Sequence, residues 1–333
     1  MTDTRFDVLC IGNAIFDVLA TVEEDFLVAE GLTKGSMRLV DAEEAVRLYD
    51  RIGAAVRIPG GCAGNTASGV ASLGGRAAFV GKVAADEPGD AYGHDMRGAG
   101  IHFATPSLKD GAPTARSIIL ITPDGERTMN TYLGACQELG PADVDAATVE
   151  AAAITYLEGY LWDPPAAKEA FRRASDIAHA AGNRVAITLS DSFCVDRWRP
   201  EFLSLLRTGT VDTLFANEHE LKALYETSDL DSAISAVRED AGLAIVTLGA
   251  AGSMAVTREE THHVRAHPVD KVVDLTGAGD LFASGFLTGL ARGLPLPDCA
   301  RLGGIAAAEC IGHVGPRPQA KLVDLARQDG FEI

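Results

Sequence analysis

The sequence predicts an α/β protein with a doubly wound, mainly parallel sheet, helices on both faces of that sheet, and a small additional β-sheet. Short apolar runs alternate with helix-like runs over most of the 333 residues, which is typical of repeated strand–helix–strand units. One hairpin-like segment interrupts this alternation. Because 333 residues are more than one core usually fills, we expect a single large domain, residues 1–333, with an appendage.

Six short apolar runs, several of them bounded by Gly or Asp, are predicted to be buried parallel strands. These runs are Phe6–Ile11, Ala77–Val83, Ile154–Leu157, Val185–Leu189, Thr213–Ala216 and Ala244–Leu248. Helical spacing predicts helices between them at Asn65–Leu73, Pro165–Ala181, Glu218–Tyr225 and Ser232–Ala241. Such a sheet binds ligands at the carboxyl ends of its strands.

The appendage is predicted from an antiparallel hairpin, in which Arg116–Thr122 and Arg127–Leu133 flank the turn Pro123–Gly125. Val18–Val22 and Met37–Val40 extend it to a small sheet. We expect this sheet to form a lid, made from inserted segments at about 14–45 and 103–133. The last third of the chain is predicted to contain helices at Asp280–Arg292, Pro297–Ile311 and Pro318–Gln328.

Composition and charge restrict the classes of partner. The formal net charge of -18 disfavours a nucleic-acid backbone or an anionic membrane, because the long-range electrostatic force is repulsive. The N-terminal segment lacks a basic stretch followed by a long apolar core, and no apolar run approaches the length of a membrane span. The six cysteines form no C-x-x-C pair, which indicates reduced thiols. We therefore expect a cytoplasmic protein with small-molecule ligands. The sequence leaves a monomer and a homodimer open.

The segment VVDLTGAGDLFASGF, residues 272–286, predicts an anion site. Gly277, Ala278 and Gly279 let backbone N–H groups approach an anion closely, and the helix that follows adds unpaired donors and the positive end of its dipole. For an isolated Asp280, the simpler explanation is a helix cap or a first-turn acid that the dipole favours. If a phosphate binds in the loop, the role that suits this carboxylate is removal of a proton from the attacking hydroxyl.

Four motifs in order resemble those of the ribokinase-like (PfkB) carbohydrate and nucleoside kinases. Residues 274–280, DLTGAGD, resemble the D-T-G-A-G-D signature, with Leu275 as a departure at a variable position. Residues 60–65, GGCAGN, with LGG at 73–75 resemble the N-terminal signature, and residues 217–220 fit N-x-x-E. Residues 247–252 fit T-x-G-x-x-G. The resemblance implies a ribokinase-like fold and an ATP-dependent phosphotransferase.

The resemblance also implies roles for the residues of the glycine loop. Asp280 would be the general base, and the amides of Gly277, Ala278 and Gly279 would bind the γ-phosphate of ATP as its charge shifts. Asp274 and the backbone near Thr276 match the site of a monovalent cation, K⁺, that part of the family contains.

Two other motifs are implied to bind Mg·ATP. Asn217 and Glu220 lie on one face at the start of a predicted helix and would hold a hydrated Mg²⁺ ion, although a helix-capping pair explains them as well. Thr247, Gly249 and Gly252 would position ATP at the end of a strand. The alternative for these three residues is an ordinary tight turn.

The acceptor site is predicted near the first strand. Asp17 can accept two hydrogen bonds from adjacent hydroxyls, although it can also be a turn residue. Asn13 and Asn65 offer donors and acceptors, and Gly61 lets the backbone come close. This set suits a vicinal diol, as in a sugar or a nucleoside.

Apolar residues favour a nucleoside over a free sugar. They are Met37, Met129, Leu133 and Tyr160. Each of them alone is better explained by a place in the core, and it is the group that favours a nucleoside. Arg127 matches, by position, an arginine that binds the transferred phosphate in adenosine kinases of the family, and its alternative is a surface arginine.

Taken together, the resemblance implies transfer of the γ-phosphate of ATP to the 5′-hydroxyl of adenosine, a purine-salvage reaction. The alternatives are a kinase of ribose, fructose or 2-keto-3-deoxygluconate, a kinase of inosine or guanosine, and a ligand-sensing protein without turnover. A dinucleotide-dependent oxidoreductase is disfavoured because Gly12-Asn13-Ala14 lacks G-x-G-x-x-G after the first strand.

Overall fold

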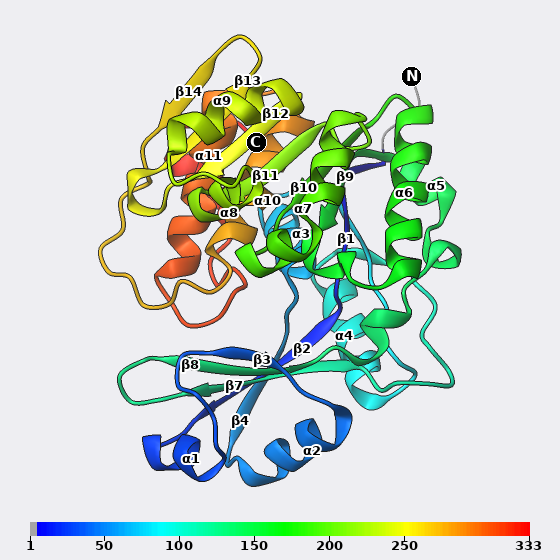
Figure 1. Ribbon diagram of the computed structural model, residues 1–333, viewed down its shortest axis with the longest axis vertical. Coiled ribbons are helices and arrows are strands. Elements are labelled where there is room, and N and C mark those ends of the chain that lie inside the picture. The colour runs from blue at the N-terminus through cyan, green and yellow to red at the C-terminus, as the bar shows by residue number, and fades with distance from the viewer. Residues whose placement is uncertain (1–4) are drawn as a thin grey trace.

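The computed structural model describes residues 5–333 and contains a large and a small sheet (Figure 1). The large sheet has the strand order β14-β13-β12-β11-β10-β9-β1-β5-β6. All its neighbours pair in parallel except β12 with β13 and β13 with β14. The strands are β1 Phe6–Ile11, β5 Ala77–Val80, β6 His102–Phe103, β9 Ala152–Glu158, β10 Arg184–Thr188, β11 Thr213–Asn217, β12 Leu243–Thr247, β13 Ser253–Thr257 and β14 Thr261–Val264.

Helices cover both faces of this sheet, as predicted. Successive side chains of a strand point to opposite faces, so Leu9 and Ile11 belong to one core and Val8 and Cys10 to the other. The first core is closed by α5 Ala146–Glu150, α6 Pro165–Ala180, α7 Ser192–Arg207, α8 Glu218–Leu224 and α9 Leu230–Asp240. The second is closed by α3 Cys62–Ser72, α4 Glu87–Gly98, α10 Ala278–Ala291 and α11 Leu296–Ile311. A further layer packs α12 Leu322–Gln328 against α3 and α11.

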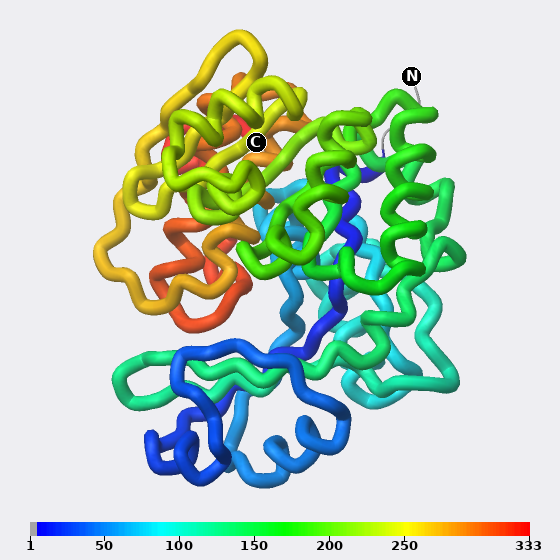
Figure 2. The backbone as a smooth tube through the Cα atoms, viewed as in Figure 1, coloured from blue at the N-terminus to red at the C-terminus, as the bar shows by residue number. Residues whose placement is uncertain are grey.

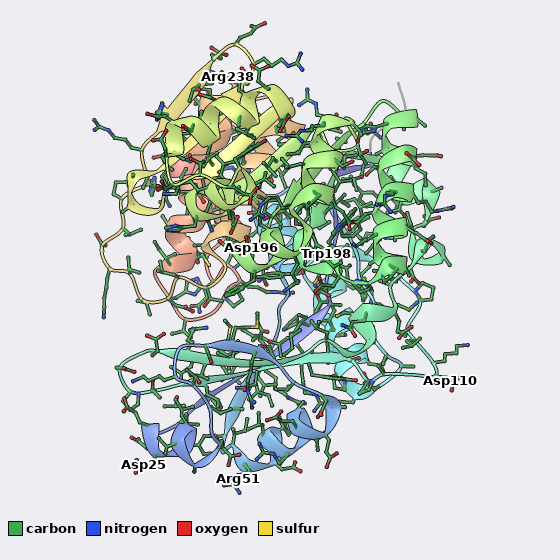
Figure 3. The ribbon with its side chains drawn as sticks, in the orientation of Figure 1. Asp25, Arg51, Asp110, Asp196, Trp198 and Arg238 are labelled. Atoms are coloured by element: carbon green, nitrogen blue, oxygen red, sulfur yellow. The ribbon has the colours of Figure 1, made fainter. Side chains whose placement is uncertain are left out.

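The small sheet and its helices, here called the lid, lie below the large sheet in Figure 1. Its strand order is β3-β8-β7-β2-β4, and Ala20, Ile118 and Leu120 point to the helices on its far face. Asp25 and Arg51 project from these helices away from the large sheet (Figure 3). The elements are β2 Ile15–Thr21, α1 Glu24–Ala29, β3 Met37–Leu39, α2 Ala42–Arg51, β4 Ala55–Pro59, β7 Ala115–Ile121 and β8 Arg127–Tyr132.

The chain enters the lid directly after β1 and returns to the large sheet through β4 and α3 (Figure 2). The predicted hairpin is present as the antiparallel pair β7 and β8. The sheet also includes β4, which lies outside the two segments predicted for the lid.

Two differences from the predicted elements have local causes. The helix predicted from Pro318 begins at Leu322, because the amides of Gln319 and Ala320 donate to the Glu309 carboxylate and form a bend before the helix. The hairpin β13–β14 was not predicted, because Thr261–Val264 has two histidines and no apolar alternation. Within residues 5–333, no helix combines the length and apolarity needed to cross a membrane.

Candidate active site

The candidate site lies at the carboxyl ends of the parallel strands, where α3 and α10 begin. Each helix starts after a glycine with positive φ, Gly61 at 84° and Gly277 at 80°. This places Asn65 in the first turns of α3, with its side-chain amide donating to Asp280 Oδ2 at 2.9 Å. Thr66 Oγ1 also donates to the carbonyl of Asp280, at 3.2 Å. The two predicted signatures therefore meet in one site although 215 positions separate these residues.

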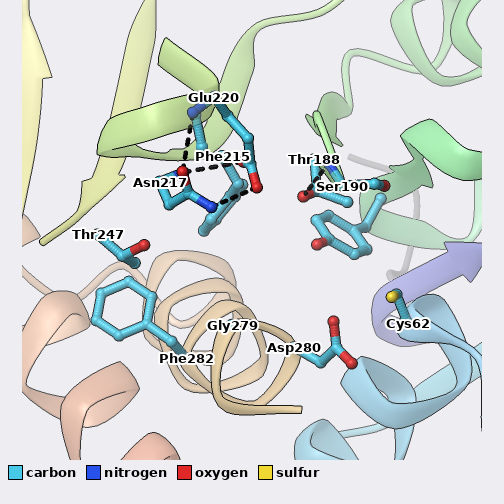
Figure 4. A pocket seen from close by; sticks show the side chains of 12 residues that line it. Cys62, Thr188, Ser190, Phe215, Asn217, Glu220, Thr247, Gly279, Asp280 and Phe282 are labelled. Atoms are coloured by element: carbon cyan, nitrogen blue, oxygen red, sulfur yellow. Dashed lines mark hydrogen bonds between the residues drawn. The ribbon is translucent and has the colours of Figure 1, made fainter. Parts of the chain in front are cut away.

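Asp280 has the proton affinity of a base that works near neutral pH. Burial raises its pKa to about 7, the amide of Asn65 acts against this rise, and the carboxylates of Glu158 and Asp17 add to it. Its side chain lines a cavity that also contains Cys62 and Gly279 (Figure 4). General bases are most effective when their pKa lies near the working pH.

The glycine loop provides part of the predicted set of donors. Among residues 5–333, the amides of Gly277 and Gly279 donate to no protein acceptor. The amide of Ala278 instead donates to the carbonyl of Leu275 at 3.2 Å, which removes Ala278 from the free donors. A Cβ on Gly277 would lie 2.6 Å from Pro316 Cβ, so glycine is required by space as well as by φ.

Glu158, at the end of β9, is a site residue that the sequence reasoning missed. Its carboxylate accepts from the Asn13 side chain at 2.7 Å, from the Ala63 amide at 2.8 Å and from the Asn13 amide at 3.3 Å. It is fully buried, and burial raises its pKa to about 7. A Cβ on Gly12 would lie 2.3 Å from its Oε2. The sequence signal that could have indicated Glu158 is an acidic residue at the end of an apolar strand, directly before Gly159.

The residues predicted to bind a diol converge around Asp17, on β2. Asp17 is buried, and burial raises its pKa to about 7 against the opposing effect of Arg317 and Arg127. A Cβ on Gly60 would lie 2.2 Å from Asp17 Oδ2, and one on Gly61 would lie 2.1 Å from the carbonyl of Asn13. Both glycines are therefore needed for this close approach. Nothing in the sequence pattern singled out Arg317.

Asn217 and Glu220 form the capping pair that was left open as an alternative. The Asn217 side chain accepts from the Glu220 amide at 2.9 Å and donates to Glu220 Oε1 at 2.5 Å, and the Asn217 amide donates to Oε2 at 2.9 Å (Figure 4). Both residues also line the cavity of Asp280. Because both carboxylate oxygens already accept protein hydrogen bonds, the pair fits a Mg²⁺ ion held through water molecules.

The T-x-G-x-x-G motif forms a tight turn at the end of β12. Gly249 and Gly252 have φ of 57° and 99°, and the Gly252 amide donates to the Gly249 carbonyl at 3.0 Å. Thr247 lines the same cavity as Asp280. A Cβ on Gly252 would lie 2.1 Å from the carbonyl of Val264.

The apolar residues predicted to contact the acceptor separate into two groups. Met37 and Met129 are partners in β3 and β8 of the lid. Leu133 follows the end of β8, before a short helical turn at Gly134–Glu138. Tyr160 lies in another turn, Gly159–Trp162, where its amide donates to Ser190 Oγ at 3.1 Å. The structure therefore brings the two methionines together and places Tyr160 in the turn that follows β9.

Arg127 and Asp274, predicted to bind phosphate and a cation respectively, form one ion pair. The guanidinium of Arg127 at the start of β8 contacts Asp274 Oδ2, and both side chains are largely buried. Oδ2 also accepts from the Gly315 amide at 2.8 Å, and Oδ1 accepts from the Thr276 amide at 3.0 Å. The residues as arranged do not fit the monovalent cation predicted at Asp274 and Thr276.

Comparison with known proteins gives the family. The pattern of the pfkB family carbohydrate kinases matches residues 7–321. The structure of adenosine kinase from Sinorhizobium meliloti is 54% identical and has a TM-score of 0.92, with 98% of this chain and 100% of that chain covered. A probable sugar kinase protein from Rhizobium etli is 52% identical, with a TM-score of 0.93 and coverage of 98% and 99%. Fructokinase from Salmonella typhimurium is 27% identical over 83% of this chain and 91% of its own length. This chain is thus a kinase that belongs to the pfkB carbohydrate kinase family.

Proposed function

We propose that this kinase transfers the γ-phosphate of ATP to the 5′-hydroxyl of adenosine and yields AMP and ADP. The observation that carries the proposal is the arrangement of Asp280, a carboxylate with a pKa of about 7, next to the free amides of Gly277 and Gly279. A base and an anion site side by side suit transfer of a phosphoryl group to an alcohol.

Asp280 takes the proton of the acceptor hydroxyl as that oxygen attacks the γ-phosphorus. Asn65 holds the carboxylate through Oδ2, which fixes its direction before the reaction. The amides of Gly277 and Gly279 and the guanidinium of Arg127 stabilise the charge on the phosphoryl oxygens in the transition state. When bound with ATP, Mg²⁺ screens the phosphates from one another. Asn217 and Glu220 would hold its water molecules, and Thr247 with the turn at Gly249–Gly252 would position the nucleotide.

The acceptor is held by the residues around β2. Asp17 accepts hydrogen bonds from two adjacent ribose hydroxyls, and Asn13 is oriented toward the same region by Glu158. Met37 and Met129 provide an apolar surface on the lid for a purine. A lid over the acceptor excludes water, so that the phosphoryl group is transferred to the sugar hydroxyl instead of water.

A sugar kinase is the second candidate. The Rhizobium etli relative, at 52% identity, is called a probable sugar kinase, and the Salmonella relative is a fructokinase. The diol site around Asp17 serves a sugar as well as a nucleoside. The aliphatic lid surface is the feature that favours adenosine.

A panel of acceptors separates the candidates. ADP release is measured with Mg·ATP and, at equal concentration, adenosine, inosine, guanosine, ribose, fructose or 2-keto-3-deoxygluconate. We expect adenosine to give the highest kcat/KM. A sugar with a higher kcat/KM would refute the adenosine assignment, and binding without ADP release would identify a sensor. A cytoplasmic location and a monomeric or dimeric state stay predictions.

A further inference from the structure

Arg127 and Asp274 join two parts of the fold. Arg127 follows the turn of the β7–β8 hairpin in the lid, and Asp274 lies in the loop before α10, three positions ahead of Gly277. The exposed fractions of their side chains are 14% and 5%. The ion pair therefore links the lid to the segment that carries the glycine loop and Asp280.

Asp274 accepts three hydrogen bonds from the protein. Its Oδ2 accepts from the guanidinium and from the Gly315 amide, and its Oδ1 accepts from the Thr276 amide. The Thr276 carbonyl, the other oxygen expected to bind a cation, accepts from the Cys310 thiol at 3.3 Å. A K⁺ ion would compete with these donors for the oxygens, and the positive charge beside Asp274 is already supplied by Arg127.

The guanidinium is only partly used by Asp274. Arg127 Nη2 makes the ion pair, whereas Nη1 is buried and has no hydrogen-bond partner among residues 5–333. A buried N–H group without an acceptor is unfavourable, so its presence points to an anionic ligand that completes it. The rigid fork of a guanidinium allows one nitrogen to be anchored while the other is presented.

We propose that Asp274 is a positioning residue, which anchors Arg127 through Nη2 and directs Nη1 toward the transferred phosphoryl group, so that the guanidinium takes the place of a monovalent cation. The first half rests on the phosphotransfer function proposed above. The second half, that K⁺ has no site at Asp274 in the wild-type protein, is independent of turnover.

Thermal unfolding tests the second half without any substrate. The Tm is measured in KCl and in choline chloride at equal ionic strength, because a cation that binds only the native state raises Tm. For the wild type we expect the same Tm in both salts. For Arg127→Ala we expect a higher Tm in KCl than in choline chloride, because the Asp274 carboxylate loses its guanidinium partner. This difference should vanish in the double variant with Asp274→Asn. A K⁺-dependent Tm in the wild type, or none in Arg127→Ala, would overturn the replacement.

Kinetics test the first half. We expect Asp274→Asn to lower kcat about 10- to 100-fold with little change in the KM of the acceptor, since the phosphate contact loses its alignment. In the Arg127→Ala background, Asp274→Asn should cause no further loss, because it acts through Arg127. Losses that multiply instead would show that Asp274 acts by itself and would overturn the proposal.

Two further variants complete the test. Asp143→Asn breaks another largely buried ion pair, Lys82 with Asp143, and should lower Tm while leaving kcat within about twofold. Arg127→Lys keeps the positive charge but lacks the two-nitrogen fork of the guanidinium, so its kcat should also fall. This variant tests the anchoring role if Asp274→Asn does not fold, and a wild-type kcat in it would contradict that role. If the wild type releases no ADP with any acceptor, the proposed function fails, and the salt comparison still decides the cation question.

Discussion

Replacing Asp280 by Asn should separate catalysis from stability. The change removes the proton acceptor but keeps the shape of the side chain, and an Asn oxygen can still accept from the Asn65 amide, which now donates at 2.9 Å. General-base catalysis contributes roughly 10²–10⁴-fold, so kcat should fall by that factor, equivalent to about 3–5 kcal/mol. The affinity for Mg·ATP should be retained, because the amides of the loop are unchanged.

The same variant should be more stable than the wild type at neutral pH. The pKa of Asp280 is raised from its ordinary 3.8 to about 7, so the ionised form is disfavoured in the folded state. A pKa raised by burial leaves stability unaffected below about pH 4, and the destabilisation grows as the pH rises from about 4 to 7. At about 1.4 kcal/mol for each tenfold change in proton affinity, its upper limit is about 4 kcal/mol.

Two measurements, each on the wild type and the variant, check this reasoning. Denaturant unfolding at pH 4.5 and pH 8 gives the free energy of unfolding of both proteins, and the advantage of Asp280→Asn should increase with pH. The wild-type kcat should rise with pH through about 7, whereas the variant should lose this dependence. Turnover close to the wild type in Asp280→Asn, or lower stability of the variant at pH 8, would refute the role or the electrostatics assigned to Asp280.

Three other predictions concern binding and packing. Asp17→Asn should raise the KM of the acceptor about 10- to 100-fold with a smaller effect on kcat, because hydrogen bonds to a charged group contribute about 1.5–3 kcal/mol. An unchanged KM would show that Asp17 does not bind the acceptor. Asn217→Ala should lose about 1 kcal/mol of stability and should also raise the KM of Mg·ATP. As a control, Asp229→Ala removes the cap of α9 and should lower stability without changing this KM. A KM of Mg·ATP in Asn217→Ala equal to that of the wild type would show that Asn217 only caps α8. Gly12→Ala places a Cβ 2.3 Å from Glu158 Oε2 and should lower the free energy of unfolding by about 1–3 kcal/mol in urea titrations. The control Gly98→Ala, with open space around the new Cβ, should leave this free energy unchanged or raise it. An unchanged free energy of unfolding in Gly12→Ala would show that the surroundings of Glu158 adapt to the added methyl group.

Much of the fold was predictable because its signals are local. The apolar runs that form β1, β9, β10, β11 and β12 and the glycines before α3 and α10 are visible in short windows of sequence. The hairpin β7–β8 was predictable from its Pro-Asp-Gly turn for the same reason. The strand β4 was missed because Ala55–Pro59 is short and ends in proline, which is usually a sign against a strand.

The site residues were predictable where a motif carries them and not where packing does. Asp280, Asn65 and Asn217 occur in recognisable spacings. Glu158 and Arg317 are buried next to residues that are distant in sequence, so no short stretch of sequence shows these contacts. The pairing of Arg127 with Asp274 spans 147 positions and depends on how the lid meets the loop before α10, so separate motifs assigned the two residues to separate ligands.

The pKa values of the carboxylates explain how a protein of net charge -18 accommodates a polyanion. Asp17, Glu158 and Asp280 all have a pKa of about 7, so near neutral pH the empty site carries less negative charge than three ionised acids would. An approaching phosphate is therefore repelled less than the composition implies. Cations that arrive with it would favour ionisation of Asp280 again. With the role proposed for Asp280, the base would become fully active only when the charges that the reaction needs are present, so that its proton affinity would be coupled to the assembly of the reacting complex.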